Sequence, residues 1–288
     1  MHLGGKIMHS LGIVFVALVV VLITSVVLIQ YLVYMPIVLL TYNPVFIIYH
    51  GIVGHLCLAN VAYYYYKAHS TNPGNPPNDS RFSTAPVTVC KKCVAPKPPR
   101  SHHCTACSKC ILKMDHHCPW INNCVGHFNH RYFFLMLFHT CLACLYVITN
   151  GYPYFAKSWG IRPRQLAAGG SWYSFTHNAI IYQFVLCSAA ALPTACMVIQ
   201  HVLLISRAET MIEVLLNQKE KILCKVEKRP FRNIYHFGFV ENWKIFLSIS
   251  EEHPWWCMFL PCSPPIVGDG VNWLNHEDYK TLDPVIEV

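Results

Sequence analysis

The chain has 288 residues, of which 54% are hydrophobic and only 12% are charged, and its formal net charge is +8. Soluble domains average about 25% charged residues, so this composition excludes an ordinary soluble domain and places much of the chain in lipid. Aromatic and basic residues do not alternate in a soluble segment, so the positive charge gives no reason to expect a nucleic-acid partner.

Four apolar segments are long enough to cross a bilayer, whose core requires roughly 20 residues of helix. They cover residues 11–34, 44–66, 132–155 and 179–206, and no acidic or basic residue interrupts any of them. The first is too long for the apolar core of a signal peptide and is followed by no small-residue cleavage site, so we expect a retained anchor. The sequence therefore predicts an all-α polytopic membrane protein with four transmembrane helices.

Lysine and arginine positions predict the orientation of these spans. Residues 67–131 hold nine basic and two acidic residues, and the chain after residue 206 holds nine more basic residues. The loop between the third and fourth spans has three basic residues, and the first loop has none. Since basic loops stay in the cytosol, we expect both termini there. Besides attracting anionic lipid head groups, the charge offers four candidates for binding a phosphate-bearing substrate: Lys97, Arg100, Lys109 and Lys113.

Composition divides the chain into five predicted segments. An N-terminal arm and two spans occupy residues 1–66, and a linker rich in proline and asparagine occupies 67–86. A cytosolic cysteine-rich module follows at 87–131, then the third and fourth spans with a lumenal loop at 132–206, then a cytosolic tail at 207–288. Within the tail, residues 207–222 have helical composition, and the chain from residue 251 onward is predicted to be irregular.

Residues 90–124 contain seven cysteines and four histidines. Cytosolic cysteines stay reduced, so their Cys-x-x-Cys spacing indicates metal binding rather than disulfides. A structural zinc ion takes four such ligands, so two ions would use eight of the eleven candidates and leave three for other chemistry. A single zinc ion with spectator cysteines is the alternative, and the spacing does not identify the spared cysteine.

The run Asp115-His116-His117-Cys118 within this pattern resembles the DHHC family of protein S-acyltransferases, also called palmitoyltransferases. The following residues agree with the resemblance: Pro119, Trp120, Asn122, Asn123, Val125, Gly126, Asn129 and Phe133. The resemblance implies two Cys3His zinc sites interleaved in sequence, one of Cys90, Cys93, His103 and Cys110, the other of Cys104, Cys107, His117 and Cys124. It leaves Cys118, His116 and Asp115 as the reacting group and His102 as a lone histidine.

The implied reaction transfers a long-chain fatty acyl group, typically palmitoyl, from acyl-CoA to cytosolic cysteines of membrane-associated protein substrates by a ping-pong mechanism. A free cysteine thiol has a pKa of about 8.5 and is mostly protonated at neutral pH, so Cys118 needs an adjacent base. His116 would take its proton, and Asp115 would orient His116. The zinc ions would be structural, since four protein ligands leave no open coordination position. The resemblance also favours the endoplasmic reticulum membrane, with the Golgi as the alternative.

Two further segments resemble family motifs with one departure each. Residues 210–213 resemble a Thr-Thr-x-Glu motif, in which Thr210 and Glu213 match and Met211 replaces the second threonine. These two residues would tie the tail to the module or merely cap a helix. Residues 233–238 resemble an Asn-Pro-x-x-x-Gly element with Ile234 in place of proline, and Asn233 is the expected structural anchor.

Two other classes of protein compete with the enzyme. A non-catalytic zinc-binding membrane adaptor would have no need for an ionisable thiol beside a histidine. A transporter is disfavoured because the spans lack acidic and basic residues, which usually mark ion pathways.

Overall fold

The structure is a computed structural model that describes residues 3–77, 88–161 and 169–274. The second part of the predicted linker, the centre of the predicted lumenal loop and the last residues of the tail lie outside the described residues. The chain divides into two compact units. The first comprises Met1–Val16, Tyr64–Leu135 and Ile199–Val288, and the second comprises Ala17–Tyr63 and Met136–Val198.

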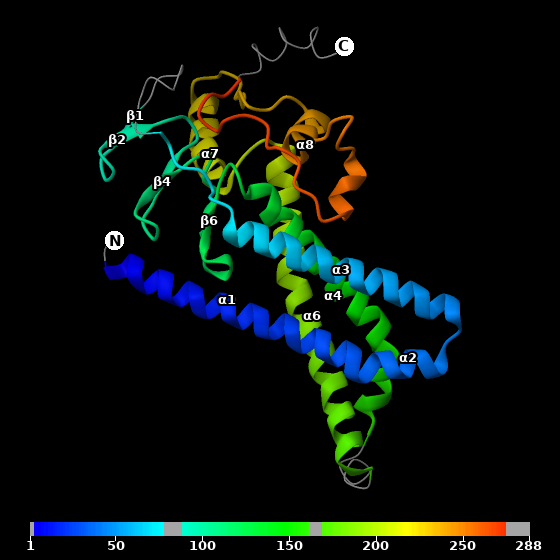
Figure 1. Cartoon of the computed structure of the whole chain (residues 1–288). Coiled ribbons are helices and arrows are strands. Elements are labelled where there is room, and N and C mark those ends of the chain that lie inside the picture. Colours follow the sequence, from blue (N-terminus) through cyan, green and yellow to red (C-terminus); the bar gives the residue numbers. More distant parts are fainter. Residues whose placement is uncertain (1–2, 78–87, 162–168, 275–288) are drawn as a thin grey trace. The chain divides into compact units, whose positions relative to one another are not determined.

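Four long helical segments correspond to the four predicted spans and confirm them (Figure 1). Each is long and apolar enough to cross a membrane, so this is a multi-pass membrane protein. The first runs through α1 (Leu3–Ile29), a π-helical turn η1 (Gln30–Tyr34) and α2 (Met35–Thr41). The others are α3 (Pro44–Ser70), α4 (His130–Trp159) and α6 (Gly170–Ser206). All are longer than predicted, because residues that flank the predicted runs continue the helices.

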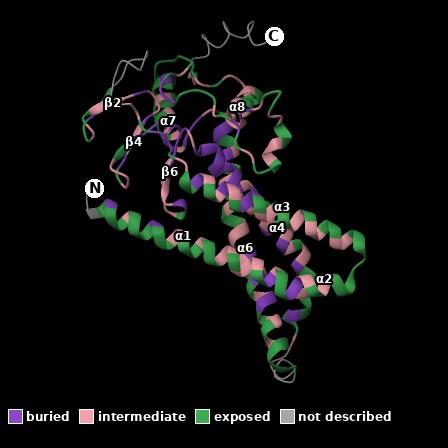
Figure 2. Cartoon of the chain, in the orientation of Figure 1, coloured by how far each residue is buried: buried purple, intermediate pink, exposed green. Residues whose placement is uncertain are grey.

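The second unit contains only helical segments in its described part. Its polar side chains pair with one another: His50 Nδ1 lies 2.7 Å from the Tyr146 hydroxyl, and His55 Nε2 lies 2.6 Å from the Tyr31 hydroxyl. Many of its apolar side chains are exposed, as the green stretches along these helices show (Figure 2). In a bilayer that exposure carries no hydrophobic cost, and the paired histidines fulfil the packing role that we expect of polar groups inside spans.

The cysteine-rich module in the first unit consists of three two-stranded antiparallel hairpins. Their strands are β1 (Thr88–Cys90) with β2 (Ala95–Lys97), β3 (His102–Cys104) with β4 (Lys109–Ile111), and β5 (His116–Cys118) with β6 (Asn123–Val125). A 3₁₀ turn, η3 (Pro119–Ile121), connects the last two strands. Strands this short bury too little apolar surface to be stable alone, so the module needs other cross-links.

The tail contributes α7 (Met211–Val226), α8 (Phe239–Leu247) and a 3₁₀ turn η4 (Trp255–Phe259). The predicted helix at 207–222 therefore begins four residues late. The cause is the end of α6 at Ser206, where Ala208 adopts a φ of 52° and the Glu209 N–H donates to the Leu204 carbonyl at 2.9 Å. Thr210 then caps α7, and no other helix or strand follows η4 in the described part of the tail.

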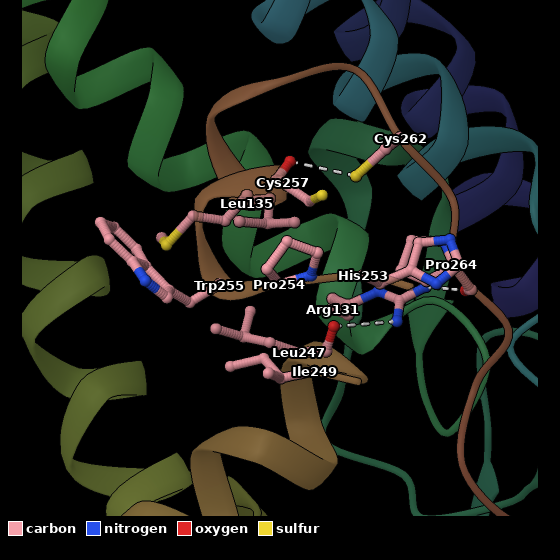
Figure 3. A pocket seen from close by; sticks show the side chains of 11 residues that line it. Arg131, Leu135, Leu247, Ile249, His253, Pro254, Trp255, Cys257, Cys262 and Pro264 are labelled. Carbon is pink, nitrogen blue, oxygen red and sulfur yellow. Dashed lines mark hydrogen bonds between the residues drawn. The ribbon is translucent and has the colours of Figure 1, made fainter. Parts of the chain in front are cut away.

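Two buried polar side chains join the tail to the long helices within the first unit. Arg131 of α4 is only 3% exposed, and its guanidinium donates to the Ser248 hydroxyl at 2.6 Å. It also donates to the Pro264 carbonyl (Figure 3). The Tyr64 hydroxyl of α3 donates to the Leu260 carbonyl at 2.7 Å. Since buried polar groups are stabilised by hydrogen bonds, these contacts tie residues 248–264 to α3 and α4.

Candidate active site and metal centres

The third hairpin separates the two histidines of the Asp-His-His-Cys run. Successive side chains of a strand point to opposite faces, so His116 and Cys118 of β5 share one face and His117 points to the other. Cys118 is 6% exposed at the end of the strand. His116 therefore lies on the same face as the thiol, and His117 is directed to the second cysteine cluster. The alternation of side chains along one three-residue strand is enough to separate these two roles.

Asp115 lies directly before this strand and bonds to His116. The His116 Nδ1–H donates to Asp115 Oδ2 at 2.7 Å, and the Asp115 side chain is completely buried. Burial alone would lower the pKa of His116, but hydrogen bonds to Asp115 and Cys118 outweigh it and raise this pKa to about 9. Burial would raise the pKa of Asp115, but its bond to His116 and nearby histidines hold this pKa well below the ordinary value. The site therefore keeps Asp115 ionised and stabilises the imidazolium that forms when His116 accepts a proton.

A backbone N–H from the tail forms a second hydrogen bond to the Asp115 carboxylate. The Met211 N–H, at the first position of α7, donates to Asp115 Oδ1 at 2.8 Å. This N–H belongs to the helix terminus, where backbone donors have no partner within the helix and favour negative charge. Each Asp115 oxygen thus receives one donor, which restrains the rotation of the carboxylate.

Thr210 and Glu213 serve both of the roles that the sequence left open. They form a capping box on α7: the Glu213 N–H donates to the Thr210 hydroxyl at 3.2 Å, and the Thr210 N–H donates to Glu213 Oε2 at 2.9 Å. Glu213 also accepts two bonds from Arg100, at 2.6 and 2.7 Å, and this joins the tail to the module. Arg100 is therefore engaged by a carboxylate, contrary to its expected availability for a phosphate.

The structure brings together the four donor atoms of the first predicted zinc site. Cys90, Cys93, His103 and Cys110 place one donor atom each within 4.8 Å of the others. His103 Nδ1 lies 3.7 Å from Cys90 Sγ, 3.1 Å from Cys93 Sγ and 4.0 Å from Cys110 Sγ. With bonds of about 2.1 Å to nitrogen and 2.3 Å to sulfur, a tetrahedral zinc ion separates such ligands by about 3.6–3.8 Å. The donor set fits zinc.

The second predicted site has the same geometry. Cys104, Cys107, His117 and Cys124 also converge within 4.8 Å. His117 Nδ1 lies 3.4 Å from Cys107 Sγ and 3.5 Å from Cys124 Sγ, and these two sulfur atoms are 3.4 Å apart. The Cys107 N–H donates to Cys104 Sγ at 3.3 Å, which suits a thiolate ligand. Both clusters could therefore bind zinc, and Cys118 belongs to neither.

Backbone strain at the two cysteine turns is a further sign of metal ligation. Val94 and Ser108, which directly follow Cys93 and Cys107, have φ values of 51° and 56°. For a β-branched residue such as Val94 this conformation costs roughly 1–3 kcal/mol and persists only where surrounding interactions impose it. A metal ion bound by both cysteines of each turn would supply that restraint.

Four other residues lie outside both metal clusters and the reacting group and contact neighbouring parts of the structure. His102 pairs with Ile111 in the second hairpin and joins neither metal cluster. His127 Nε2 bonds to the Gly268 carbonyl at 3.0 Å. The Lys113 ammonium lies 5.6 Å from the centre of the Trp273 ring, and burial together with the Arg100 charge lowers its pKa to about 7. Asn233 donates to the Arg207 carbonyl at 2.8 Å, as befits an anchor.

Sequence reasoning missed two groups near Asp115. One is the Met211 N–H, which no side-chain pattern reveals. The other consists of His130 and His201, whose donor atoms converge with that of Asp115 within 4.8 Å. Their only signal in the sequence is a histidine at the edge of an apolar span, which is a common packing feature.

The chain resembles known proteins along most of its length. A family model described as DHHC palmitoyltransferase matches residues 84–218, which contain both metal clusters and Cys118. The chain is 38% identical to palmitoyltransferase ZDHHC16A of Danio rerio, across 95% of this chain and 81% of that protein. It is 40% identical to ZDHHC16 of Mus musculus, across 93% and 75%. Identity to ZDHHC15 of Homo sapiens is 30%, across 72% and 56%.

Proposed function

Because the chain belongs to the DHHC palmitoyltransferase family and is a protein S-palmitoyltransferase, we propose that it works by a ping-pong reaction through an acyl-Cys118 intermediate. The donor is a long-chain acyl-CoA, and the acceptors are cysteines of membrane-associated proteins. The observation that supports this most is the shared strand face of Cys118 and His116, with the Asp115 carboxylate 2.7 Å behind the imidazole.

The first step loads the enzyme. His116 Nε2 takes the proton of the Cys118 thiol, and the sulfur attacks the carbonyl carbon of the acyl thioester. The bond between that carbon and the sulfur of CoA breaks, and the departing thiolate takes the proton from His116. Hydrogen bonding raises the pKa of His116 to about 9, which favours the protonated ring that exists between these two events.

The second step repeats the chemistry in the opposite direction. A cysteine thiol of the protein substrate gives its proton to His116 and attacks the acyl-Cys118 carbonyl carbon. Cys118 leaves as a thiolate and is reprotonated by His116. Asp115 remains a carboxylate throughout. It holds neutral His116 in the tautomer with Nδ1 protonated, so that Nε2 can accept the proton of the thiol.

Zinc would be held by Cys90, Cys93, His103 and Cys110 in one site and by Cys104, Cys107, His117 and Cys124 in the other. Its contribution when bound is structural, because four protein ligands leave no position for substrate. Two ligands of the second site lie in the third hairpin, where His117 and Cys124 pair across the strands. Their ligation would restrain the backbone that carries His116 and Cys118 on the opposite face.

The distribution of basic residues supports an orientation with both termini and the module in the cytosol. Acyl-CoA and cytosolic protein cysteines would then reach Cys118 from the same side. The endoplasmic reticulum is the proposed membrane, with the Golgi as the alternative.

The test is acyl loading of purified protein by palmitoyl-CoA, measured as intact mass and as hydroxylamine-sensitive label. Wild type should form a labile adduct, Cys118→Ala should form none, and Cys257→Ala, which removes a tail cysteine, should load normally. Cys118→Ser should likewise be inactive and keep its zinc content. A Cys118→Ser protein that lost zinc would show that this cysteine is a ligand. If folded, zinc-loaded wild type formed no adduct, the result would contradict this proposal and favour a non-catalytic adaptor.

A further inference from the structure

A buried pair of histidines lies beside the Asp115–His116 pair in the first unit. His130 is the first residue of α4 and is 3% exposed, and His201 lies near the end of α6 and is completely buried. His130 Nε2 and His201 Nδ1 share a hydrogen bond of 3.2 Å. The pair thus links two long helices directly next to the reacting group.

The histidine pair contacts both members of the proposed acid–base couple. One nitrogen of each ring lies within 4.8 Å of an Asp115 carboxylate oxygen. The Phe133 ring packs edgewise against His116, with ring centres 5.0 Å apart, and against His201, with centres 5.4 Å apart. Through this ring, the position of His201 limits how far the His116 imidazole can turn.

The pair is a costly way to join two helices. A buried polar group without a hydrogen bond destabilises the folded state by about 1–3 kcal/mol, and two leucines would pack α4 against α6 without that cost. Yet His130 Nδ1 and His201 Nε2 have no hydrogen-bond partner among the described residues. Where a protein departs from the usual rules of packing, the departure tends to lie at a functional site. These two unbonded nitrogens lie beside Asp115.

We propose that His130 and His201 are positioning residues of acyl transfer, which hold the Asp115 carboxylate and the His116 ring in the orientation that Cys118 requires. This inference rests on the proposed function of Asp115, His116 and Cys118. Neither histidine touches the acyl group. The pair places two imidazole dipoles next to the carboxylate and keeps the Phe133 ring against His116, and both effects act on the geometry of the base rather than on substrate binding.

The decisive variants remove or imitate the shared hydrogen bond. His201→Leu should lower the rate constant of acyl loading about 10- to 100-fold, because a misplacement of about 1 Å at a reacting group costs roughly that much. Its KM for palmitoyl-CoA should not change. His201→Asn presents an amide near the position of Nδ1 and should retain most of the rate. His236→Leu removes a histidine of the same unit that bonds Asn242 and should load normally.

The double variant His130→Leu/His201→Leu separates positioning from stability. Replacing both buried polar partners with apolar groups is nearly neutral for stability, so its melting temperature should approach that of wild type. Its loading rate should stay low. If that rate instead recovered together with stability, the pair would be a structural link only and the proposal would be wrong.

Three other results have defined meanings. Wild type that forms no adduct contradicts the proposed function itself, before the histidine variants are compared. Wild type and His201→Leu that load at equal rates contradict the positioning role alone. A third zinc equivalent per wild-type chain, lost in His201→Leu, would identify Asp115, His130 and His201 as a metal site and overturn the inference.

Discussion

Met211→Pro tests whether the backbone donor of α7 controls the Asp115 carboxylate. Met211 occupies the first position of the helix, where proline is well tolerated because its missing N–H has no partner within the helix. Thr210 before it is extended, with φ −99° and ψ 167°, and this conformation suits a residue that precedes proline. The substitution therefore removes one hydrogen bond, that to Asp115 Oδ1, and leaves the capping box in place.

The magnitude follows from the charge of the acceptor. A hydrogen bond to a charged group contributes about 1.5–3 kcal/mol. Each 1.36 kcal/mol lost from transition-state stabilisation is about a tenfold loss in rate. If the bond serves to orient Asp115 behind His116, Met211→Pro should slow acyl loading about 10- to 150-fold. Zinc content and the circular-dichroism signal of the helices should not change.

The control is Met211→Ala, which removes the same side chain and keeps the N–H. Single-turnover loading with palmitoyl-CoA, followed by mass, compares the two variants with wild type. The alanine variant should load within about threefold of wild type, since it shortens a half-buried side chain and keeps the N–H that bonds Asp115. Equal rates for the proline and alanine variants would refute the role of this hydrogen bond.

Three further perturbations address the carboxylate, the metal sites and the tail. Asp115→Asn should slow acyl loading roughly 100-fold or more, because the amide no longer favours the protonated His116, and a normal single-turnover rate would contradict the assigned orienting role. Cys104→Ser should lower zinc from two equivalents per chain and expose the module to limited proteolysis, and an intact, fully loaded module would argue against the interleaved sites. Glu213→Gln should lower the melting temperature at pH 7, because it leaves the Arg100 guanidinium unpaired in a site where that side chain is 4% exposed. Although burial acts to raise the pKa of Glu213, the Arg100 charge and hydrogen bond lower it, so the stabilisation is complete above the ordinary glutamate pKa of about 4.5 and is lost as pH falls through the lower folded value. The difference in melting temperature between wild type and Glu213→Gln should therefore shrink in acid, and a difference that grew below pH about 4.5 would contradict this pairing.

Local patterns account for what the sequence predicted well. Runs of apolar residues identify the four spans, because the thickness of a bilayer sets their length. The Thr-x-x-Glu spacing at residue 210 identifies the capping box, because both partners lie within one helical turn. The ends of these helices differ from the prediction, because residues that flank each predicted run continue its helix.

Long-range contacts account for what the sequence did not reveal. The Met211 N–H and Asp115 are 96 residues apart, and Arg100 and Glu213 are 113 apart. A backbone donor carries no side-chain signature, so nothing at residue 211 indicates its partner. The sequence shows the charge of Arg100 but not the carboxylate that pairs with it, and this explains why Arg100 was a candidate for binding a phosphate.

Because the two ligand sets are interleaved in sequence, two bound metal ions would hold the module together even after its chain was cleaved. Thr105 and Ala106 lie in the turn between β3 and β4. Cleavage between them would leave three ligands of the first cluster on one fragment and Cys110 on the other. The second cluster would be divided in the opposite sense, with only Cys104 on the first fragment. A nicked module should thus migrate as one species in a native gel and separate into two pieces once a chelator is added.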